Sequence, residues 1–131
     1  MKIPALSVKQ PWVNMIDRGE KTIETRTWKT NYRGPLVIAS SQTPDTAAMP
    51  ASECPGPFGM AVCIVELIDC RPMALFEDEH DACCRWDPDL FAWVFEPGNV
   101  RHIEPPFAVR GRQGIFTVEL DERMILQGEN K

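Results

Sequence analysis

A compact helix–turn–strand unit near the start of the chain constrains the fold more than any other segment. Pro11 suits the first turn of a helix, and Trp12 and Ile16 follow it at helical spacing on one apolar face. Gly19 then provides a helix stop, because a residue in the left-handed conformation is favoured there. The β-branched residues in 22–28 predict a strand immediately after the turn.

Side chains alternate between the two faces of the predicted strand 22–28. Thr22, Glu24, Arg26 and Trp28 share one face, and the intervening residues share the other. A carboxylate, a guanidinium and an indole on one face are unusual for a core. The alternative is a simple ion pair on a solvated strand, which would contribute about 0–1 kcal/mol. The pattern alone does not decide between a functional face and this ion pair.

Short apolar segments predict the rest of the architecture. Each predicted strand is a brief apolar or β-branched run between turn signals, and these runs are 36–39, 59–70, 90–95, 100–103 and 115–120. A short helix is expected near Thr43 and another over 72–81, whereas Pro105 and Pro106 are expected to end the strand that begins at 100. Strands outnumber helices, and their irregular spacing favours an α+β fold built on a small mixed or antiparallel β-barrel with short flanking helices.

The length of the chain, 131 residues, is typical of one domain. We expect a single domain over 1–120, followed by a largely polar tail over 121–131 that frays. No apolar run approaches the length of a membrane span, and the first residues lack the apolar stretch of a signal peptide. We therefore expect no membrane association and a cytoplasmic location, with a monomer as the default oligomeric state.

The five cysteines and two histidines limit the chemistry that the chain can perform. The number of cysteines is odd and no Cys-x-x-Cys pair occurs, so neither a disulfide framework nor a zinc site is indicated. Cys63 and Cys70 fall in a predicted strand and are expected in the core, whereas the adjacent Cys83 and Cys84 carry a weaker indication of redox activity. Glycine motifs for phosphates or dinucleotides are missing. We expect no metal and no cofactor.

Charge is distributed unevenly along the chain. The net charge is −5, which argues against nucleic-acid binding through a broad basic surface. Residues 1–35 nevertheless hold seven Lys or Arg and three acidic residues, so this part carries +4 and the remainder carries −9. An anionic ligand would be steered toward the first part of the chain. A pocket for one or a few nucleotides fits this distribution better than a surface for a long duplex.

Glu66 is the exception in the longest apolar strand, 59–70. A carboxylate among Ile64, Val65 and Leu67 is rarely buried without a partner. Either Glu66 reaches solvent at an opening of the barrel, or a cation such as Lys21 or Arg26 meets it.

Several blocks of residues occur in order along the chain: Leu6-Ser7-Val8-Lys9-Gln10-Pro11-Trp12, Gly19-x-Lys21-x-x-Glu24-x-Arg26-x-Trp28, Tyr32-Arg33-Gly34-Pro35-Leu36, the strand from Gly59 to Cys70, and Val109-Arg110-Gly111-Arg112-Gln113-Gly114-Ile115-Phe116. These blocks resemble the ASCH domain, the activating signal cointegrator-1 homology domain, over nearly the whole chain. The resemblance implies a barrel related to the PUA fold, with flanking helices around a basic cleft. It also implies that this cleft binds RNA or another nucleic acid.

Nucleic-acid or nucleotide binding is the first functional hypothesis. Basic side chains would neutralise phosphate while Trp12 or Trp28 stacks on a base, and stacking contributes about 1–3 kcal/mol per base. In the turn 110–114, glycines would expose backbone N–H groups and arginines would fork onto phosphate. The predicted binding residues are Lys9, Gln10, Trp12, Arg26, Trp28, Lys29, Arg33, Arg110 and Arg112.

A small hydrolase acting on a modified nucleoside or a short RNA is the second hypothesis, since one branch of the family is similar to amidohydrolases of acylated cytidine and another is linked to RNA cleavage. Lys21 would be the base or activating group, Glu66 would carry the proton, and Glu24 would flank them. The amidohydrolase-like members have a threonine nucleophile where this chain has Glu24, so Glu24 is equally a candidate structural partner of Lys21 or Arg26. A protein-interaction domain of the coactivator type, with a protein partner, is the third hypothesis.

Overall fold

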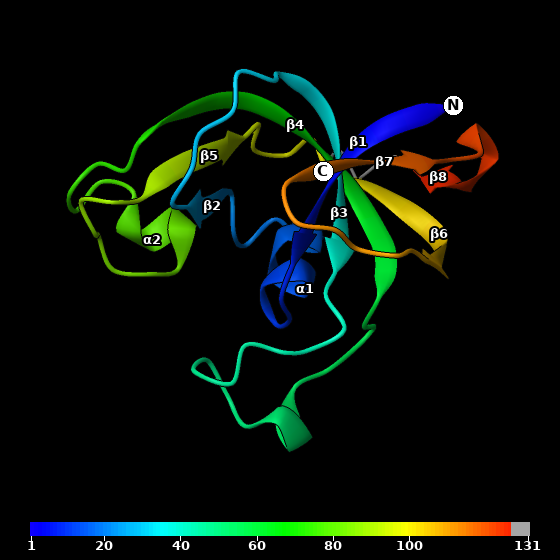
Figure 1. The fold of residues 1–131 in the computed structure, drawn as a ribbon, viewed down its shortest axis with the longest axis horizontal. Coiled ribbons are helices and arrows are strands. Elements are labelled where there is room, and N and C mark those ends of the chain that lie inside the picture. Colours follow the sequence, from blue (N-terminus) through cyan, green and yellow to red (C-terminus); the bar gives the residue numbers. More distant parts are fainter. Residues whose placement is uncertain (127–131) are drawn as a thin grey trace.

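A curled sheet of eight strands organises residues 1–126, the part of the chain that this computed structural model describes (Figure 1). In chain order the strands are β1 (Lys2–Val8), β2 (Ile23–Arg26), β3 (Gly34–Ser40), β4 (Met60–Pro72), β5 (Phe91–Phe95), β6 (Arg101–Ala108), β7 (Ile115–Glu119) and β8 (Ile125–Leu126). The helical elements are the α-helices α1 (Trp12–Asp17) and α2 (Glu79–Ala82) and the short 3₁₀ helices η1 (Ala51–Glu53) and η2 (Glu122–Met124).

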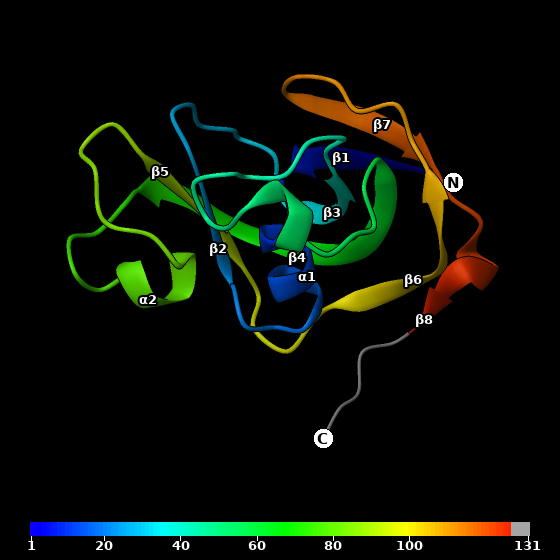
Figure 2. The same ribbon diagram turned by 90° about the horizontal axis from the view of Figure 1, so that it is seen from below.

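Strand β4 bends the sheet because it pairs with different strands along its length. Its first part pairs with β6 and its second part with β5, while β3 runs along its other edge. The main path is β2-β5-β4-β3-β1-β7, in which β1 and β3 are parallel and the other pairs are antiparallel. The result is a half-barrel (Figures 1 and 2). The predicted fold class, α+β with a small mixed barrel and short flanking helices, is confirmed.

The core joins the predicted helix to this curved sheet. Val13 and Ile16 of α1 are buried in one apolar cluster with Leu36 of β3 and Trp93 of β5, and α1 packs against β3 and β4 (Figure 2). A second cluster lies among β1, β3, β4 and β7. Cys63 is fully buried as predicted, and this burial raises the pKa of its thiol well above the usual value.

The segment 41–58 forms turns and η1, so the helix predicted near Thr43 is wrong. Its backbone is tied to the start of α1 instead, because the Asp45 amide donates a hydrogen bond of 2.8 Å to the Gln10 carbonyl oxygen. Thr43 followed by Pro44 is a local signal for the start of a helix. The hydrogen bond between Asp45 and Gln10, which are more than thirty residues apart in the sequence, overrides it.

The helix predicted over 72–81 is also shorter than expected, because α2 covers four residues. The buried carboxylate of Asp78 accepts hydrogen bonds from the Arg71 guanidinium and from the Ala74 amide. These bonds hold the residues before α2 in turns. The Arg71 guanidinium lowers the pKa of Asp78, with the Ala74 amide as a further cause.

Strand β6 continues through Pro105 and Pro106, so the predicted break there is wrong. The register between β4 and β6 shifts at this point: Cys63 is opposite His102, and Ala61 is opposite Phe107. Four residues of β6 therefore face a single residue of β4. Prolines donate no N–H to a ladder, and an irregularity of this kind is where a sheet tolerates them.

The expected frayed tail also differs in its first half. After Asp121, η2 is followed by β8, in which Ile125 and Leu126 pair with Ile103 and His102 of β6. Residues 127–131 lie outside the described part of the chain. Within residues 1–126 no helix is long and apolar enough to cross a membrane.

Candidate functional site

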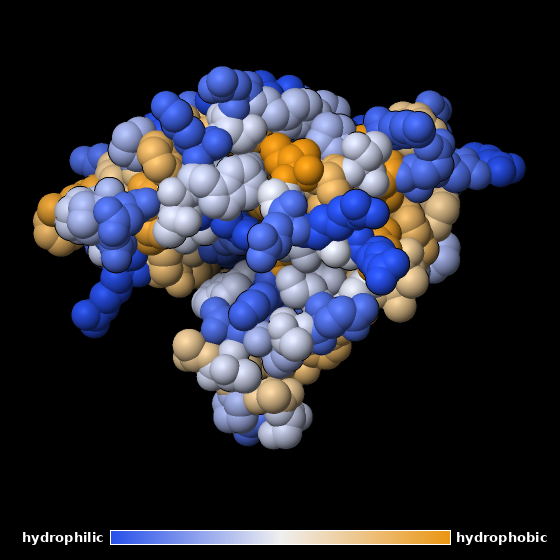
Figure 3. All heavy atoms as spheres, in the orientation of Figure 1, coloured by the Kyte–Doolittle hydropathy of each residue, from blue (hydrophilic) through white to orange (hydrophobic). Residues whose placement is uncertain are grey.

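A cleft of about 520 Å³ opens between β2, α2 and the segment that follows β3. In Figure 3 it is a hollow between the lobe that carries α2 and the lower lobe formed by the segment 41–58, and strongly hydrophilic side chains line it. We call this pocket the cleft, and its lining residues are Ser7, Lys9, Trp12, Lys21, Glu24, Thr25, Arg26, Thr27, Trp28, Ser41, Asp45, Ala82, Cys83 and Cys84.

Three local features of the sequence deliver side chains to the cleft. The helix α1 brings Trp12, and Gly19 then reverses the chain with a left-handed φ of 79° so that Lys21 follows directly. Strand β2 lies at the end of the sheet path and pairs with β5 along one side. Consecutive residues line the cleft here, Glu24 to Arg26 from β2 and Thr27 and Trp28 directly after its end, and not only alternate ones.

A charge cluster at the floor of the cleft is centred on Glu24. The ammonium Nζ of Lys21 lies 3.6 Å from Glu24 Oε1, and the guanidinium Nη2 of Arg26 donates a hydrogen bond of 3.0 Å to Glu24 Oε2. Lys21 and Glu24 are 4% and 8% exposed. The ion pair between Glu24 and Arg26 that the sequence left open is thus present, but Glu24 is buried and not on a solvated strand. Each carboxylate oxygen of Glu24 faces one cation, so Glu24 is a structural partner of both.

Lys21 is held on three sides. Its ammonium donates a hydrogen bond to the Ala82 carbonyl oxygen at the end of α2, in addition to its contact with Glu24. It also lies 5.4 Å from the centroid of the Trp12 ring, within the range of a cation–π interaction. Lys21 therefore connects α1, β2 and α2 and is held in place after the turn.

The two tryptophans of the motif border the cleft as half-buried residues. The Trp12 indole Nε1 donates a hydrogen bond of 2.8 Å to Asp45 Oδ2, which places Asp45 at the rim. This hydrogen bond is the main cause that lowers the pKa of Asp45, and the nearby Lys9 charge lowers it further. Trp28 packs edge-to-face on the buried Trp93, with 4.7 Å between the ring centroids.

Polar residues that the motif analysis did not select also line the cleft. Thr25 was assigned to the opposite face of the strand, yet its hydroxyl lies 3.7 Å from the Cys84 sulfur in the cleft wall. Ser7 and Ser41 share a hydrogen bond of 3.0 Å between their hydroxyl oxygens. The sequence signal that could have found Thr25 is the end position of β2 in the sheet, because an unpaired edge exposes residues of both parities.

Gln10, which the sequence analysis selected for nucleic-acid binding, lies away from the lining of the cleft. Its side chain is fully buried and makes three hydrogen bonds: to Asn14 Oδ1, to the Pro57 carbonyl oxygen, and from the Asn14 amide. Gln10 is thus a structural residue that joins α1 to the end of the segment 41–58.

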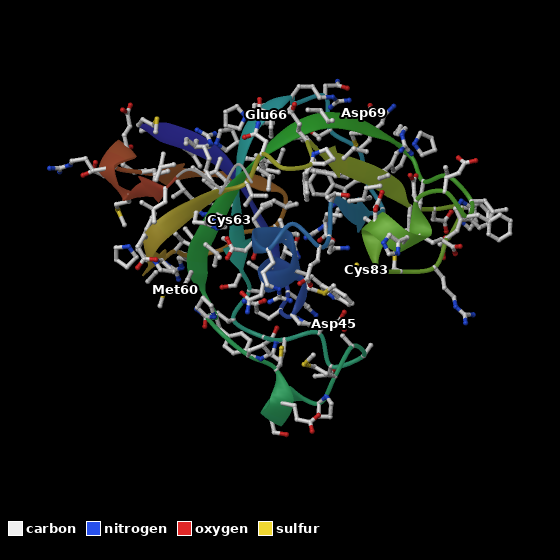
Figure 4. All side chains as sticks on the ribbon, turned by 180° about the vertical axis from the view of Figure 1, so that it is seen from behind. Asp45, Met60, Cys63, Glu66, Asp69 and Cys83 are labelled. Carbon is white, nitrogen blue, oxygen red and sulfur yellow. The ribbon has the colours of Figure 1, made fainter. Side chains whose placement is uncertain are left out.

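Glu66 lies away from the cleft and does not meet Lys21 or Arg26. In Figure 4, Glu66 lies near Asp69 at the top of the sheet, far from Asp45 and Cys83, which line the cleft. Its negative charge contributes, after burial, to raising the pKa of the Tyr32 hydroxyl. Of the two alternatives for Glu66, contact with Lys21 or Arg26 is thus not found, and its side chain is partly exposed to solvent.

The remaining predicted binding residues are distributed around the cleft. Lys9 is exposed and lines it, whereas Lys29 is exposed but lies outside its lining. Arg33 is turned away, since its guanidinium donates hydrogen bonds to the carbonyl oxygens of Thr30 and Tyr32. Arg110 and Arg112 line neighbouring cavities, and Arg112 lines the one that adjoins the cleft.

The ionisable lining of the cleft comprises three cations, Lys9, Lys21 and Arg26, and two carboxylates, Glu24 and Asp45, apart from its two thiols. Within residues 1–126, no three side chains of His, Cys, Asp or Glu come together as they would to hold a metal ion. The arrangement offers positive charge, hydroxyl groups and two indole rings to a ligand, which is chemistry suited to an anionic aromatic molecule.

A half-barrel with a polar cleft along its edge strand β2 is consistent with the family that the motifs suggested. The sequence model of the ASCH domain matches residues 6–107, and the chain belongs to the ASCH domain family. It is also similar to activating signal cointegrator 1 of Homo sapiens and of Mus musculus, each 28% identical over a stretch covering 96% of this chain. The chain spans 23% of the length of these relatives.

Proposed function

We propose that the cleft binds one nucleotide unit of RNA or of another single-stranded nucleic acid. The base stacks on an indole of Trp12 or Trp28, and the attached phosphate is held by Lys9 and Arg26. Hydroxyl groups of Ser7 and Ser41 bond to the sugar or phosphate. The expected contribution of stacking is about 1–3 kcal/mol per base.

The observation that carries this proposal is the presence of two half-buried indole rings and two available cations in one pocket. Lys9 is exposed, and within residues 1–126 it forms no salt bridge. Arg26 makes its hydrogen bonds from Nη2 alone among the same residues, so Nη1 and Nε keep N–H donors for a ligand. The volume of about 520 Å³ lies within the usual range of ligand pockets, about 300–1,000 Å³.

The hydrolase hypothesis has less support. It required Lys21 beside a carboxylate that carries a proton, and Glu66 lies elsewhere. Glu24 contacts Lys21, but its two oxygens are already directed to Lys21 and Arg26. The protein-interaction hypothesis rests on the name of the relatives, of which this chain spans a small part.

Intrinsic tryptophan fluorescence tests the proposal directly, because both indoles border the cleft. Short single-stranded RNA should quench the emission at low salt, and Trp12→Leu or Trp28→Leu should weaken binding by about 10- to 100-fold. Trp86→Phe is the matched control, since Trp86 is exposed and lies outside the cleft. Circular dichroism should confirm that each variant is folded.

The outcomes of this titration separate the hypotheses. Absence of RNA binding at low salt would contradict the proposal. Product formation from a short RNA or from acylated cytidine would favour the hydrolase instead. Capture of a protein partner that is unaffected by nuclease treatment would favour the interaction domain.

A further inference from the structure

A second cavity of about 370 Å³ adjoins the cleft and shares part of its wall. Ser7, Arg26 and Ser41 line both cavities, so Arg26 lies at the boundary between them. The turn 109–114 between β6 and β7 forms the far side. We call this cavity the arginine groove. The polar and charged residues that line it include Ser7, Arg26, Ser41, Gln42, Arg112 and Gln113.

The lining of the arginine groove is positively charged, and Arg26 alone of its two cations is paired with a carboxylate, Glu24 on the cleft side. Arg26 and Arg112 are its ionisable lining residues, and no carboxylate lines it. Arg112 is exposed and, within residues 1–126, it takes part in no hydrogen bond or salt bridge of its side chain. A guanidinium with all five N–H donors available is well suited to fork onto a phosphate.

The remaining lining of the groove combines polar side chains with glycines, Leu6 and Val109, and it contains no aromatic ring. Gln42 and Gln113 contribute side-chain amides, and Ser7 and Ser41 contribute the hydroxyl pair at the boundary. The turn lies close against this boundary, because a Cβ built on Gly111 would be 3.1 Å from the Ser7 oxygen. Such a surface provides hydrogen bonds for phosphate and sugar oxygens and no platform for a base.

From this arrangement we propose that the arginine groove is a phosphate subsite for the nucleotide next to the one in the cleft. The inference rests on the function proposed for the cleft and extends it: the ligand class is a single-stranded oligonucleotide rather than a free nucleoside or nucleotide. Arg26 contacts the phosphate that links the two units, and Arg112 contacts the following phosphate.

The turn that carries Arg112 lies after residue 107, where the match to the family model ends, and Arg112 is not part of the lining of the cleft. The subsite is therefore separable from the cleft. It can be removed by a substitution that leaves every residue of the cleft in place.

A length series of oligouridylates, from one to about six nucleotides, tests the inference on the full chain. Affinity in the wild type should rise about 10-fold between one and three nucleotides, as a charge-assisted phosphate contact is added. Arg112→Ala should remove this rise and leave the affinity for uridine monophosphate within about two-fold of wild type. Arg110→Ala is the matched control, because Arg110 has the same charge on the same turn but does not line the groove.

Two results would overturn the inference, and they differ from failure of the proposed function. If the monophosphate binds but longer oligomers bind no more tightly, the groove is not a subsite. If Arg110→Ala weakens the trimer as much as Arg112→Ala does, the effect is general electrostatics and the assigned contact is wrong. If neither the monophosphate nor any oligomer binds at low salt, the function proposed for the cleft fails, and this inference fails with it.

Discussion

The cleft and the arginine groove share a wall but differ in how their cations are neutralised. In the cleft, buried Glu24 neutralises Lys21 and one side of Arg26, and the two indoles provide aromatic surface. In the groove, Arg112 has no carboxylate opposite it and no aromatic neighbour in the lining. The comparison shows that a cation in a motif need not be available to a ligand. Availability depends on the partners that the fold supplies.

The largest expected effect concerns the cleft, where Glu24 neutralises Lys21. Lys21→Met should lower the free energy of unfolding by about 3–5 kcal/mol, because it removes a buried partner of Glu24 and the bond to the Ala82 carbonyl. Urea denaturation followed by circular dichroism measures this loss. The matched control is Lys9→Met at the exposed rim, where a change within about 0.5 kcal/mol is expected.

A second variant distinguishes a structural Lys21 from one that acts on a ligand. In Lys21→Met/Glu24→Leu both members of the pair are apolar, and stability should recover in part, since no unpaired carboxylate is left facing the lost ammonium. RNA binding should recover with it, because Lys9 and Arg26 hold the phosphate in the proposed function. A stable double variant that no longer binds RNA would show that Lys21 contacts the ligand itself.

A smaller expected effect is the difference between the two cavities in the salt dependence of ligand affinity. Binding of uncharged uridine to the cleft should change little with ionic strength, whereas each phosphate contact should add about −0.7 to the slope of log K against log salt. The slope for a trimer should therefore become shallower by about 0.7 in Arg112→Ala. Equal slopes for the wild type and Arg112→Ala would contradict the phosphate contact assigned to the groove.

The parts of the molecule that the sequence predicted well are those fixed by local signals. Pro11 and Gly19 mark the two ends of α1, and most strands are apolar runs that keep their identity in the structure. The confirmed class, a small mixed barrel with short helices, follows from these elements together with the ASCH resemblance. The strand through Pro105 and Pro106 was missed because its irregular pairing with β4 is set by tertiary contacts.

The candidate site was harder to predict. Alternation along a strand shows which residues share a face of the sheet, but it does not show which face borders a cavity. Glu66 has a carboxylate on an apolar strand, yet its side of β4 faces away from the cleft. Gln10 lies inside the motif, but its buried side chain donates a hydrogen bond to the carbonyl oxygen of Pro57, more than forty residues away. Asp45 carried no local signal at all, since its role depends on the Trp12 indole reaching it across the mouth of the cleft.

This contact between Trp12 and Asp45 provides the smallest predicted effect and tests the rim of the cleft. The hydrogen bond from the indole lowers the pKa of Asp45 below its usual value of 3.8, so the folded state favours the charged carboxylate. A carboxylate with a depressed folded pKa contributes stability that is present above the unfolded pKa and is lost as pH falls through the folded pKa. The stability advantage of wild type over Asp45→Asn should accordingly be complete at neutral pH and shrink on acidification below about pH 4.

Trp12→Phe should remove the main cause of this shift while keeping an aromatic ring in the cleft. The pKa of Asp45, followed by NMR of its carboxyl carbon, should rise toward its usual value in this variant, with Lys9 and the Ala47 amide maintaining a smaller depression. RNA binding should fall less in Trp12→Phe than in Trp12→Leu, because phenylalanine can still stack on a base. A variant that restores the Asp45 pKa and loses as much RNA affinity as Trp12→Leu would show that the Asp45 position, and not stacking on Trp12, governs the rim.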